Sequence, residues 1–220
     1  MEENTSIPQL TAEEIRVLGS LLEKSKTTPE YYPMTINSLQ AACNQKSARK
    51  PVVTFAESTV VETIDKLKKK GLVSTVIGGG SRVTKYKHNI AIHFPLVPAE
   101  LAVLCLLFLR GPLTIGEINS NSGRLYEFDT LDEINTVLNK LATETPSYVK
   151  LLSKKIGQKE GRYVHLFSPF DEEQYESSVI EPAIGSSSSE VSALETRVQT
   201  LETELALLRT EFDKLMAELT

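Results

Sequence analysis

Apolar positions recur with the same register in two stretches of this 220-residue chain. Within each stretch the apolar residues are spaced by three and four, which predicts an amphipathic helix. Five positions of the first stretch reappear 86 residues later, namely Leu10, Glu14, Val17, Leu18 and Leu21 as Leu96, Glu100, Val103, Leu104 and Leu107. The constant displacement means that both helices bury the same face, so the chain contains a duplicated module.

Each copy continues with the same order of predicted elements. A Thr-Ile pair at 35–36 and 114–115 opens a second helix, a third helix ends in Lys-Leu, and two strand-like runs flank a turn-rich tip. The order helix, helix, helix, strand, strand is typical of a winged helix-turn-helix. We therefore predict a mainly α, α+β chain with two tandem winged helix-turn-helix domains and a C-terminal coiled-coil helix.

The first module has recognisable helix boundaries. A helix over 11–24 is capped by Thr11 with Glu14 three residues later, the capping-box pattern. A second helix is expected over 35–44, and a third over 55–70, capped by Thr54 or by Ser58. Strands are predicted over 72–77 and 82–88, around a glycine-rich tip.

The second module has a different surface. Residues 101–109 are apolar nearly all round, which places this helix between modules or between subunits. A third helix over 130–143 is expected to expose mostly acidic and amide side chains, and strands are predicted over 148–154 and 162–167. The polar residues on or near its outer face are Asp129, Asp132, Glu133, Asn135, Thr136 and Asn139. Carboxylates repel phosphate, so this module is interpreted as a packing or dimerisation unit.

A heptad repeat follows a Ser-rich linker near the C-terminus. Its apolar positions alternate by three and four, which predicts a coiled coil: Val191, Leu194, Val198, Leu201, Leu205, Leu208, Phe212, Leu215 and Leu219. A parallel homodimer is one interpretation, and a helix folded back on its own domains is the other. The predicted segments are a tail (1–9), domain 1 (10–93), domain 2 (94–170), an acidic linker (171–189) and the coiled coil (190–220).

Charge is unevenly distributed along the chain. The net charge is −5 overall, but domain 1 carries 13 Lys and Arg against 7 Asp and Glu, domain 2 is neutral, and residues 171–220 carry −9. A basic domain can still attract phosphate locally even when it is joined to an acidic C-terminal segment. Two cysteines, no bilayer-length apolar run and an acidic N-terminus favour a reducing cytoplasm over a membrane or secreted setting.

Candidate DNA contacts follow from the winged-helix interpretation. They lie in the loop before the third helix, on that helix and on the return strand: Lys46, Arg49, Lys50, Ser58, Thr59, Thr63, Lys66, Arg82, Lys85 and Lys87. Two nearby features are expected even without DNA binding. Residues 68–70 are lysines at a helix C-terminus, where the macrodipole favours cations anyway, and a glycine tip serves any tight hairpin. Glu62 on the outer face argues against base readout.

No catalytic or metal-binding constellation is predicted. Neither cysteine belongs to a zinc-type spacing, and a chance site of Cys43, His88 and His93 is disfavoured because an isolated cysteine usually packs as a small apolar residue. We therefore expect no cofactor, no metal and no enzymatic activity.

Several motifs resemble the YceH family of uncharacterised bacterial proteins over nearly the full chain. They include Leu10-Thr-Ala-Glu, Ala42-Cys-Asn-Gln-Lys46, Arg82-Val-Thr-Lys-Tyr86, Leu109-Arg-Gly111, Tyr126-Glu-Phe128 and His165-Leu-Phe-Ser168. The resemblance implies tandem winged helices, no known cofactor and no catalytic residues. Two functional hypotheses remain. One is a protein resembling a transcription regulator that binds double-stranded DNA. The other is a protein-interaction scaffold without direct DNA binding, which resembles the tandem winged-helix proteins of chromosome-organising complexes and uses the apolar helix and the coiled coil as binding surfaces.

Overall fold

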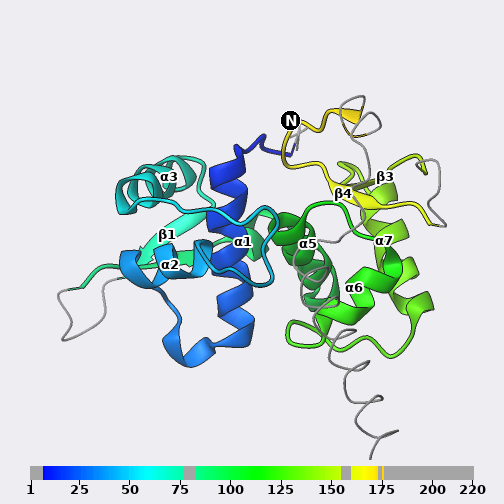
Figure 1. Ribbon diagram of the computed structural model, residues 1–220, viewed down its shortest axis with the longest axis horizontal. Helices are drawn as coiled ribbons and strands as arrows, with labels where there is room; N and C mark the ends of the chain where they lie inside the picture. Colours follow the sequence, from blue (N-terminus) through cyan, green and yellow to red (C-terminus); the bar gives the residue numbers. More distant parts are fainter. Residues whose placement is uncertain (1–6, 77–82, 155–159, 173–174, 176–220) are drawn as a thin grey trace, which may run out of the picture. The chain divides into compact units, whose positions relative to one another are not determined.

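The computed structural model describes residues 7–76, 83–154, 160–172 and 175. The chain divides into two compact units, Met1–Glu172 and Glu173–Thr220. The first unit holds all the named helices and strands (Figure 1). The predicted coiled coil and most of the predicted linker (171–189), like the tips of both hairpins, lie outside the described residues. The first unit is mainly helical with two small antiparallel sheets, so the α+β class is confirmed.

The two halves of the first unit repeat one order of elements. The N-terminal module contains α1 (Ala12–Thr27), the 3₁₀ helix η1 (Pro29–Tyr31), α2 (Ile36–Cys43), α3 (Glu57–Lys69), β1 (Val73–Val76) and β2 (Lys85–His88). A single turn, α4 (Ile90–His93), leads to the C-terminal module of α5 (Pro98–Arg110), α6 (Ile115–Ser122), α7 (Leu131–Thr143), β3 (Val149–Leu151) and β4 (Tyr163–His165). No helix in these described parts of the chain is long and apolar enough to cross a bilayer.

The helices begin where polar side chains satisfy their first backbone N–H groups. The predicted capping box of α1 is present, with Glu14 N–H donating to Thr11 Oγ1 at 3.3 Å and Thr11 N–H donating to Glu14 Oε2 at 2.8 Å. Thr114 and Glu117 form a second capping box at α6, whereas at α2 and α7 only the Thr35 and Thr130 side chains accept a backbone N–H. The predicted cap of α3 is wrong, because Ala56 precedes this helix and offers no side-chain acceptor.

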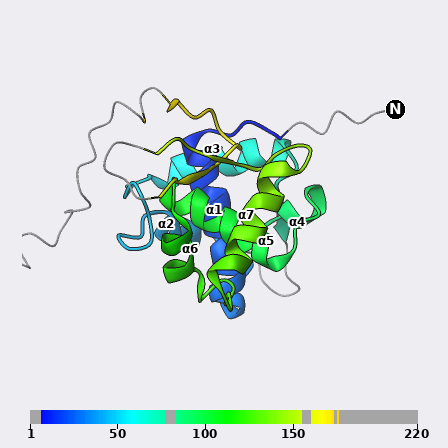
Figure 2. The ribbon, with the colours of Figure 1, turned by 90° about the vertical axis from the view of Figure 1, so that its right-hand side faces the viewer.

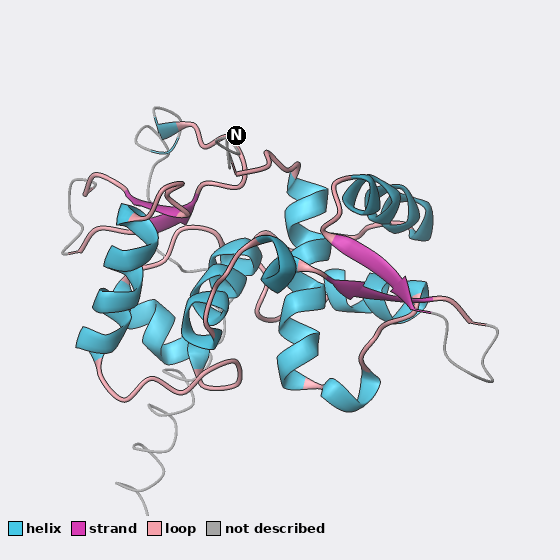
Figure 3. Cartoon of the chain, turned by 180° about the vertical axis from the view of Figure 1, so that it is seen from behind, coloured by secondary structure: helices cyan, strands magenta, loops and turns pink. Residues whose placement is uncertain are grey.

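Each hairpin gains a third, one-residue strand from the segment before the second helix. β1 pairs with β2 and β3 with β4, both antiparallel. Met34 forms an isolated bridge with Tyr86 of β2, and Leu113 forms the equivalent bridge with Tyr163 of β4. Seen from behind, the two hairpins lie on opposite sides of the central helices (Figure 3). The duplicated sequence pattern therefore corresponds to a duplicated arrangement of helices and strands.

The first helices of the two modules, α1 and α5, form the centre of the core. α1 makes its most extensive contact with α5, and α5 lies between α1 and α7 in Figure 1. The view turned by 90° shows the three helices overlapping at the centre of the unit (Figure 2). Every residue from 101 to 109 is buried. The apolar helix predicted to lie between modules or subunits thus lies between modules. Its burial leaves it no exposed apolar face for a partner protein.

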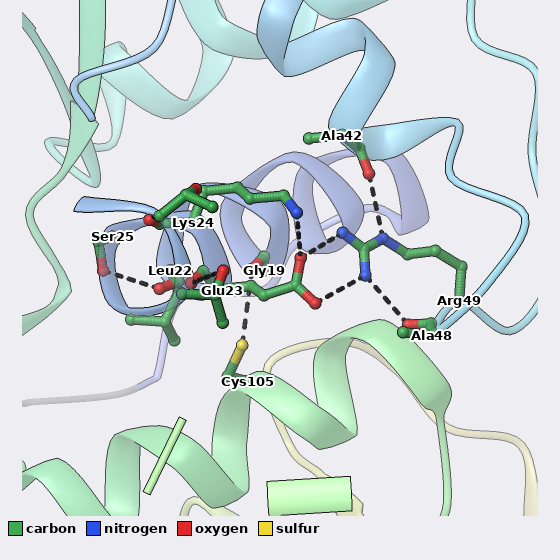
Figure 4. Close-up of polar contacts among 11 residues, drawn as sticks. Gly19, Leu22, Glu23, Lys24, Ser25, Ala42, Ala48, Arg49 and Cys105 are labelled. Atoms are coloured by element: carbon green, nitrogen blue, oxygen red, sulfur yellow. Dashed lines mark hydrogen bonds and ion pairs between the residues drawn. The ribbon is translucent and has the colours of Figure 1, made fainter. Parts of the chain in front are cut away.

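The helices approach closely where a glycine faces a cysteine. The Cys105 thiol lies 3.6 Å from the carbonyl oxygen of Gly19 (Figure 4). A Cβ on Gly19 would lie 3.0 Å from Phe108 Cβ and 3.0 Å from Leu109 Cδ2, shorter than ordinary carbon contacts. Glycine at this position is therefore what allows α1 and α5 to pack at this distance.

A buried glutamate ties each first helix to the third helix of its own module. Glu14 and Glu100 are both 1% exposed. Glu14 Oε2 accepts from Lys70 Nζ at 2.7 Å, and Glu100 Oε1 accepts from Lys140 Nζ at 2.5 Å. The repeated glutamate is thus explained by two roles, an N-terminal hydrogen bond within its helix and an ion pair between helices.

Candidate functional site

The return strand β2 presents two lysines to solvent. Lys85 and Lys87 are two residues apart and therefore lie on one face of the hairpin, opposite Val76 and Ser74. Lys87 is exposed and Lys85 half-buried, and neither side chain has an ion pair or hydrogen bond within the part of the chain that the structure describes. Arg82, the third predicted contact of this hairpin, lies outside the described residues. Two cations of the predicted site are thus positioned together on β2.

The exposed face of α3 carries no net positive charge. Ser58 and Lys66 are exposed and Thr59 is half-buried, as expected for outward positions. Three acidic residues share this surface with three lysines: Glu57, Glu62, Asp65, Lys66, Lys68 and Lys69. A phosphate approaching this helix would meet about as much repulsion as attraction.

Thr63 does not face outward, so that prediction is wrong. Its side chain is 3% exposed, and its hydroxyl donates to the carbonyl oxygen of Thr59 at 2.7 Å. The i−4 carbonyl satisfies the hydroxyl, which lets the side chain be buried. Thr63 cannot contact DNA from this position.

Arg49 is buried in an ion pair rather than offered to solvent. Its side chain is fully buried, and its two Nη atoms donate to the Glu23 carboxylate at 2.6 and 3.0 Å (Figure 4). Nε donates to the carbonyl of Ala42 at 3.1 Å and Nη1 to that of Ala48 at 3.0 Å. The guanidinium already has four acceptors, so we do not include Arg49 among the phosphate contacts that we propose.

The remaining loop cations lie far from the hairpin. Lys46 and Lys50 are exposed, but the Lys50 N–H donates to the Leu109 carbonyl at the end of α5, at 2.8 Å. The loop between α2 and α3 therefore runs beside α5, whereas the β1–β2 hairpin lies on the other side of α1 (Figures 1 and 3). The structure thus divides the predicted site into a hairpin group and a loop group.

A cleft between the modules was not predicted. It measures about 180 Å³ and is lined from both modules by Glu23, Lys24, Thr27, Gln45, Ser47, Ala48, Leu106, Leu109, Arg110, Asn121, Arg124 and Leu125. Residues from α1 and the loop after α2 form one wall, and residues from α5, α6 and the following loop form the other. The only sequence feature near the cleft is the Arg-Gly pair at the end of α5, which by itself does not predict a cleft. The two walls come together only because α1 packs on α5.

Burial favours the neutral forms of two histidines and both cysteines. His88 and His165 end the second strand of each hairpin, and burial lowers the pKa of each imidazole to about 4. Lys26 and Lys87 depress the pKa of His88 further. Burial also raises the pKa of both free thiols, Cys43 and Cys105, so neither is an activated nucleophile. Over residues 7–76, 83–154 and 160–172, no group of three His, Cys, Asp or Glu could hold a metal ion.

Comparison with known proteins places the chain among uncharacterised bacterial sequences. Residues 10–158 match the family model described as "Protein of unknown function, DUF480". A UPF0502 protein of Shewanella halifaxensis is 45% identical over 194 residues, which cover 86% of this chain and 90% of the relative. A UPF0502 protein of Citrifermentans bemidjiense is 50% identical over 159 residues, covering 72% and 74%. One from Shewanella sp. W3-18-1 is 42% identical over 220 residues, covering 96% and 100%.

Proposed function

The chain belongs to the DUF480 family of proteins of unknown function, which has no activity to transfer, and from its own residues we propose a non-enzymatic DNA-binding protein with two tandem winged helices. The proposal rests chiefly on one observation, the pair of unpartnered lysines on the return strand of the first hairpin, as far as the described residues show. In a winged helix this hairpin is the wing, which can lie along a phosphate backbone.

The order of elements supports the winged-helix interpretation in both modules. A winged helix adds to its three helices a small sheet, in which a short strand between the first two helices pairs with the hairpin. The Met34–Tyr86 and Leu113–Tyr163 bridges occupy that position. Backbone N–H and C=O groups on both sides are satisfied, with Tyr86 N–H donating to Met34 O at 2.8 Å and Met34 N–H returning the bond at 3.1 Å.

The charge pattern favours contacts with the backbone over base readout. Lys85 and Lys87 can neutralise phosphates, whereas the surface of α3 is balanced in charge. Binding through phosphates alone is strongly salt-dependent and almost independent of sequence. We therefore propose weak, sequence-tolerant binding by one chain, strengthened when two copies are joined by the predicted coiled coil.

A scaffold remains the second candidate, and one observation favours it for the C-terminal module. α7 begins among the exposed carboxylates of Asp129 and Asp132, and between them Leu131 is 52% exposed. An apolar side chain within an acidic surface suits a basic protein partner better than DNA. The burial of α5 removes the other surface on which the scaffold hypothesis relied.

A fluorescence anisotropy titration with a generic DNA duplex tests the DNA-binding proposal. The wild-type affinity should fall steeply as salt is raised. If Lys85 and Lys87 each contact one phosphate, the double substitution Lys85→Ala, Lys87→Ala should reduce the log–log salt slope by about 1.8. Lys154→Ala is the matched control, because Lys154 is an exposed cation beside the other hairpin.

The outcomes separate the two candidates. An unchanged slope in the double variant removes β2 from the DNA-binding surface. No binding by the wild type at low salt excludes the DNA proposal, and the surface around Leu131 then becomes the first place to seek a protein partner.

A further inference from the structure

The cleft between the modules contains more positive charge than its own side chains neutralise. Three cations line it, Lys24, Arg110 and Arg124, together with one carboxylate, Glu23. Arg49, which does not line the cleft, already binds both oxygens of that carboxylate. The Glu23 charge is thus satisfied without the three cations, although Lys24 Nζ also lies 3.5 Å from Glu23 Oε2.

The negative ends of helix dipoles offset only part of the positive charge in the cleft. The ends of α1, α5 and α6 carry Lys24, Arg110 and Asn121, and cations are favoured at helix C-termini whatever the function. Each C-terminus is equivalent to about −0.5 elementary charge, so three ends offset roughly half of the three cations. The remaining positive charge calls for an anion.

Neither arginine of the cleft has a carboxylate in direct contact within the described residues, although Glu23 and Glu117 attract the Arg110 guanidinium from a longer distance. Neither the Arg110 nor the Arg124 side chain makes a hydrogen bond or an ion pair within the part of the chain that the structure describes. Arg110 is half-buried, and desolvation lowers the pKa of its guanidinium. A partly desolvated, unpaired guanidinium is costly, and an anion in the cleft would recover that cost.

The size and polar groups of the cleft indicate the class of anion. A volume of about 180 Å³ holds roughly six waters at about 30 Å³ each, enough for a phosphate group with a small organic remainder. Guanidinium groups bind phosphate oxygens in pairs. The Ser47 hydroxyl and the Gln45 amide also line the cleft and can donate to the remaining oxygens.

We propose that this cleft binds the phosphate group of a small molecule between Arg110 and Arg124. Because its walls come from both modules, the occupant contacts both and stabilises their packing. This site is separate from the β2 lysines, so it stands whether or not the protein binds DNA.

The first test measures binding of inorganic phosphate and pyrophosphate to the full chain by calorimetry and thermal denaturation, at ionic strength matched with chloride. Both anions should raise the melting temperature of the wild type beyond the chloride control. Arg124→Gln should weaken pyrophosphate binding about tenfold or more. Lys26→Gln should bind like the wild type, because Lys26 is an exposed cation in the same last turn of α1 as Lys24 but does not line the cleft.

Arg110→Gln provides a second variant from the other wall, and circular dichroism verifies that each variant is folded. Arg124 is exposed and unbonded within the described ranges, so its substitution should not prevent folding. No shift with either anion, or equal loss in Lys26→Gln, would overturn the proposal. If neither anion binds but Arg124→Gln weakens duplex binding, the cleft contacts DNA backbone, and the small-molecule proposal is rejected.

Discussion

The close approach of α1 and α5 can be tested with one methyl group. Replacing Gly19 by Ala puts a Cβ 3.0 Å from Phe108 Cβ and 3.0 Å from Leu109 Cδ2. Optimal carbon contacts are about 3.5–4.0 Å, so each is short by about half an ångström or more. Leu109 Cδ2 can rotate away, but Phe108 Cβ is bonded to the backbone. Relief therefore requires the two helices to separate.

Two opposing effects set the magnitude. Overpacking in a tight core costs about 1–3 kcal/mol. Alanine in place of glycine within a helix gains about 0.5–1 kcal/mol. Gly116 isolates the gain, because it lies in α6 and a Cβ there meets only Thr114 Oγ1, at 3.9 Å. We expect Gly116→Ala to be slightly stabilising and Gly19→Ala to be less stable than Gly116→Ala by about 1–3 kcal/mol.

Urea unfolding followed by far-ultraviolet circular dichroism measures both variants against the wild type. The result should be a lower midpoint for Gly19→Ala and a higher one for Gly116→Ala, with unchanged slopes. If Gly19→Ala is as stable as Gly116→Ala, the helices tolerate the methyl group, and the close packing of α1 on α5 does not limit the stability of the fold.

Three further predictions concern the ion pair, the histidines and the tail. Arg49→Met should destabilise the fold by about 3 kcal/mol in urea unfolding, because it leaves Glu23 without its buried partner, whereas Lys46→Met in the same loop should have little effect. His88 and His165 have folded pKa values of about 4, below their ordinary value of 6.5, so unfolding takes up protons as the pH falls. Stability should therefore decline between pH 6.5 and 4, by about 2 kcal/mol per histidine at pH 5, and His165→Gln should flatten the profile measured from pH 7 to 5. A cysteine at Leu201 should give a disulfide-linked dimer under oxidation if the tail is a parallel coiled coil, since Cys43 and Cys105 are buried; a monomer on a non-reducing gel would contradict that model.

The sequence predicted the positions of helices and strands better than the tertiary contacts of individual side chains. Helical periodicity located three helices closely, with Thr11 as the predicted cap of the first and with starts predicted at Thr35 and Thr130, because capping and burial are local properties. The Arg49–Glu23 pair was missed, since its residues are 26 positions apart and nothing in a loop arginine distinguishes an ion pair from a phosphate contact. Thr63 was misassigned because a threonine can face either the core or solvent when its hydroxyl donates a hydrogen bond to a backbone carbonyl.

In the candidate site too, residues close in the sequence could be placed together, whereas residues distant in the sequence could not. Lys85 and Lys87 were found together because alternation along a strand places them on one face. The cleft between Arg110 and Arg124 could not be predicted, because periodicity identifies the buried face of α5 without identifying the helix that covers it. Only the contact with α1 brings the loop after α2 to that position.

The contact between Gly19 and Cys105 has a consequence for the history of such a chain. The two residues are 86 positions apart, so they are the same position in the two copies of the module. In a symmetric dimer of single modules, a residue on the two-fold axis meets its own copy, and both sides must be equally large or equally small. Joining the copies in one chain removes that constraint. One copy can then keep a glycine while the other has a cysteine whose sulfur atom fills the space. Two identical subunits cannot combine a small and a large residue at the same position in this way.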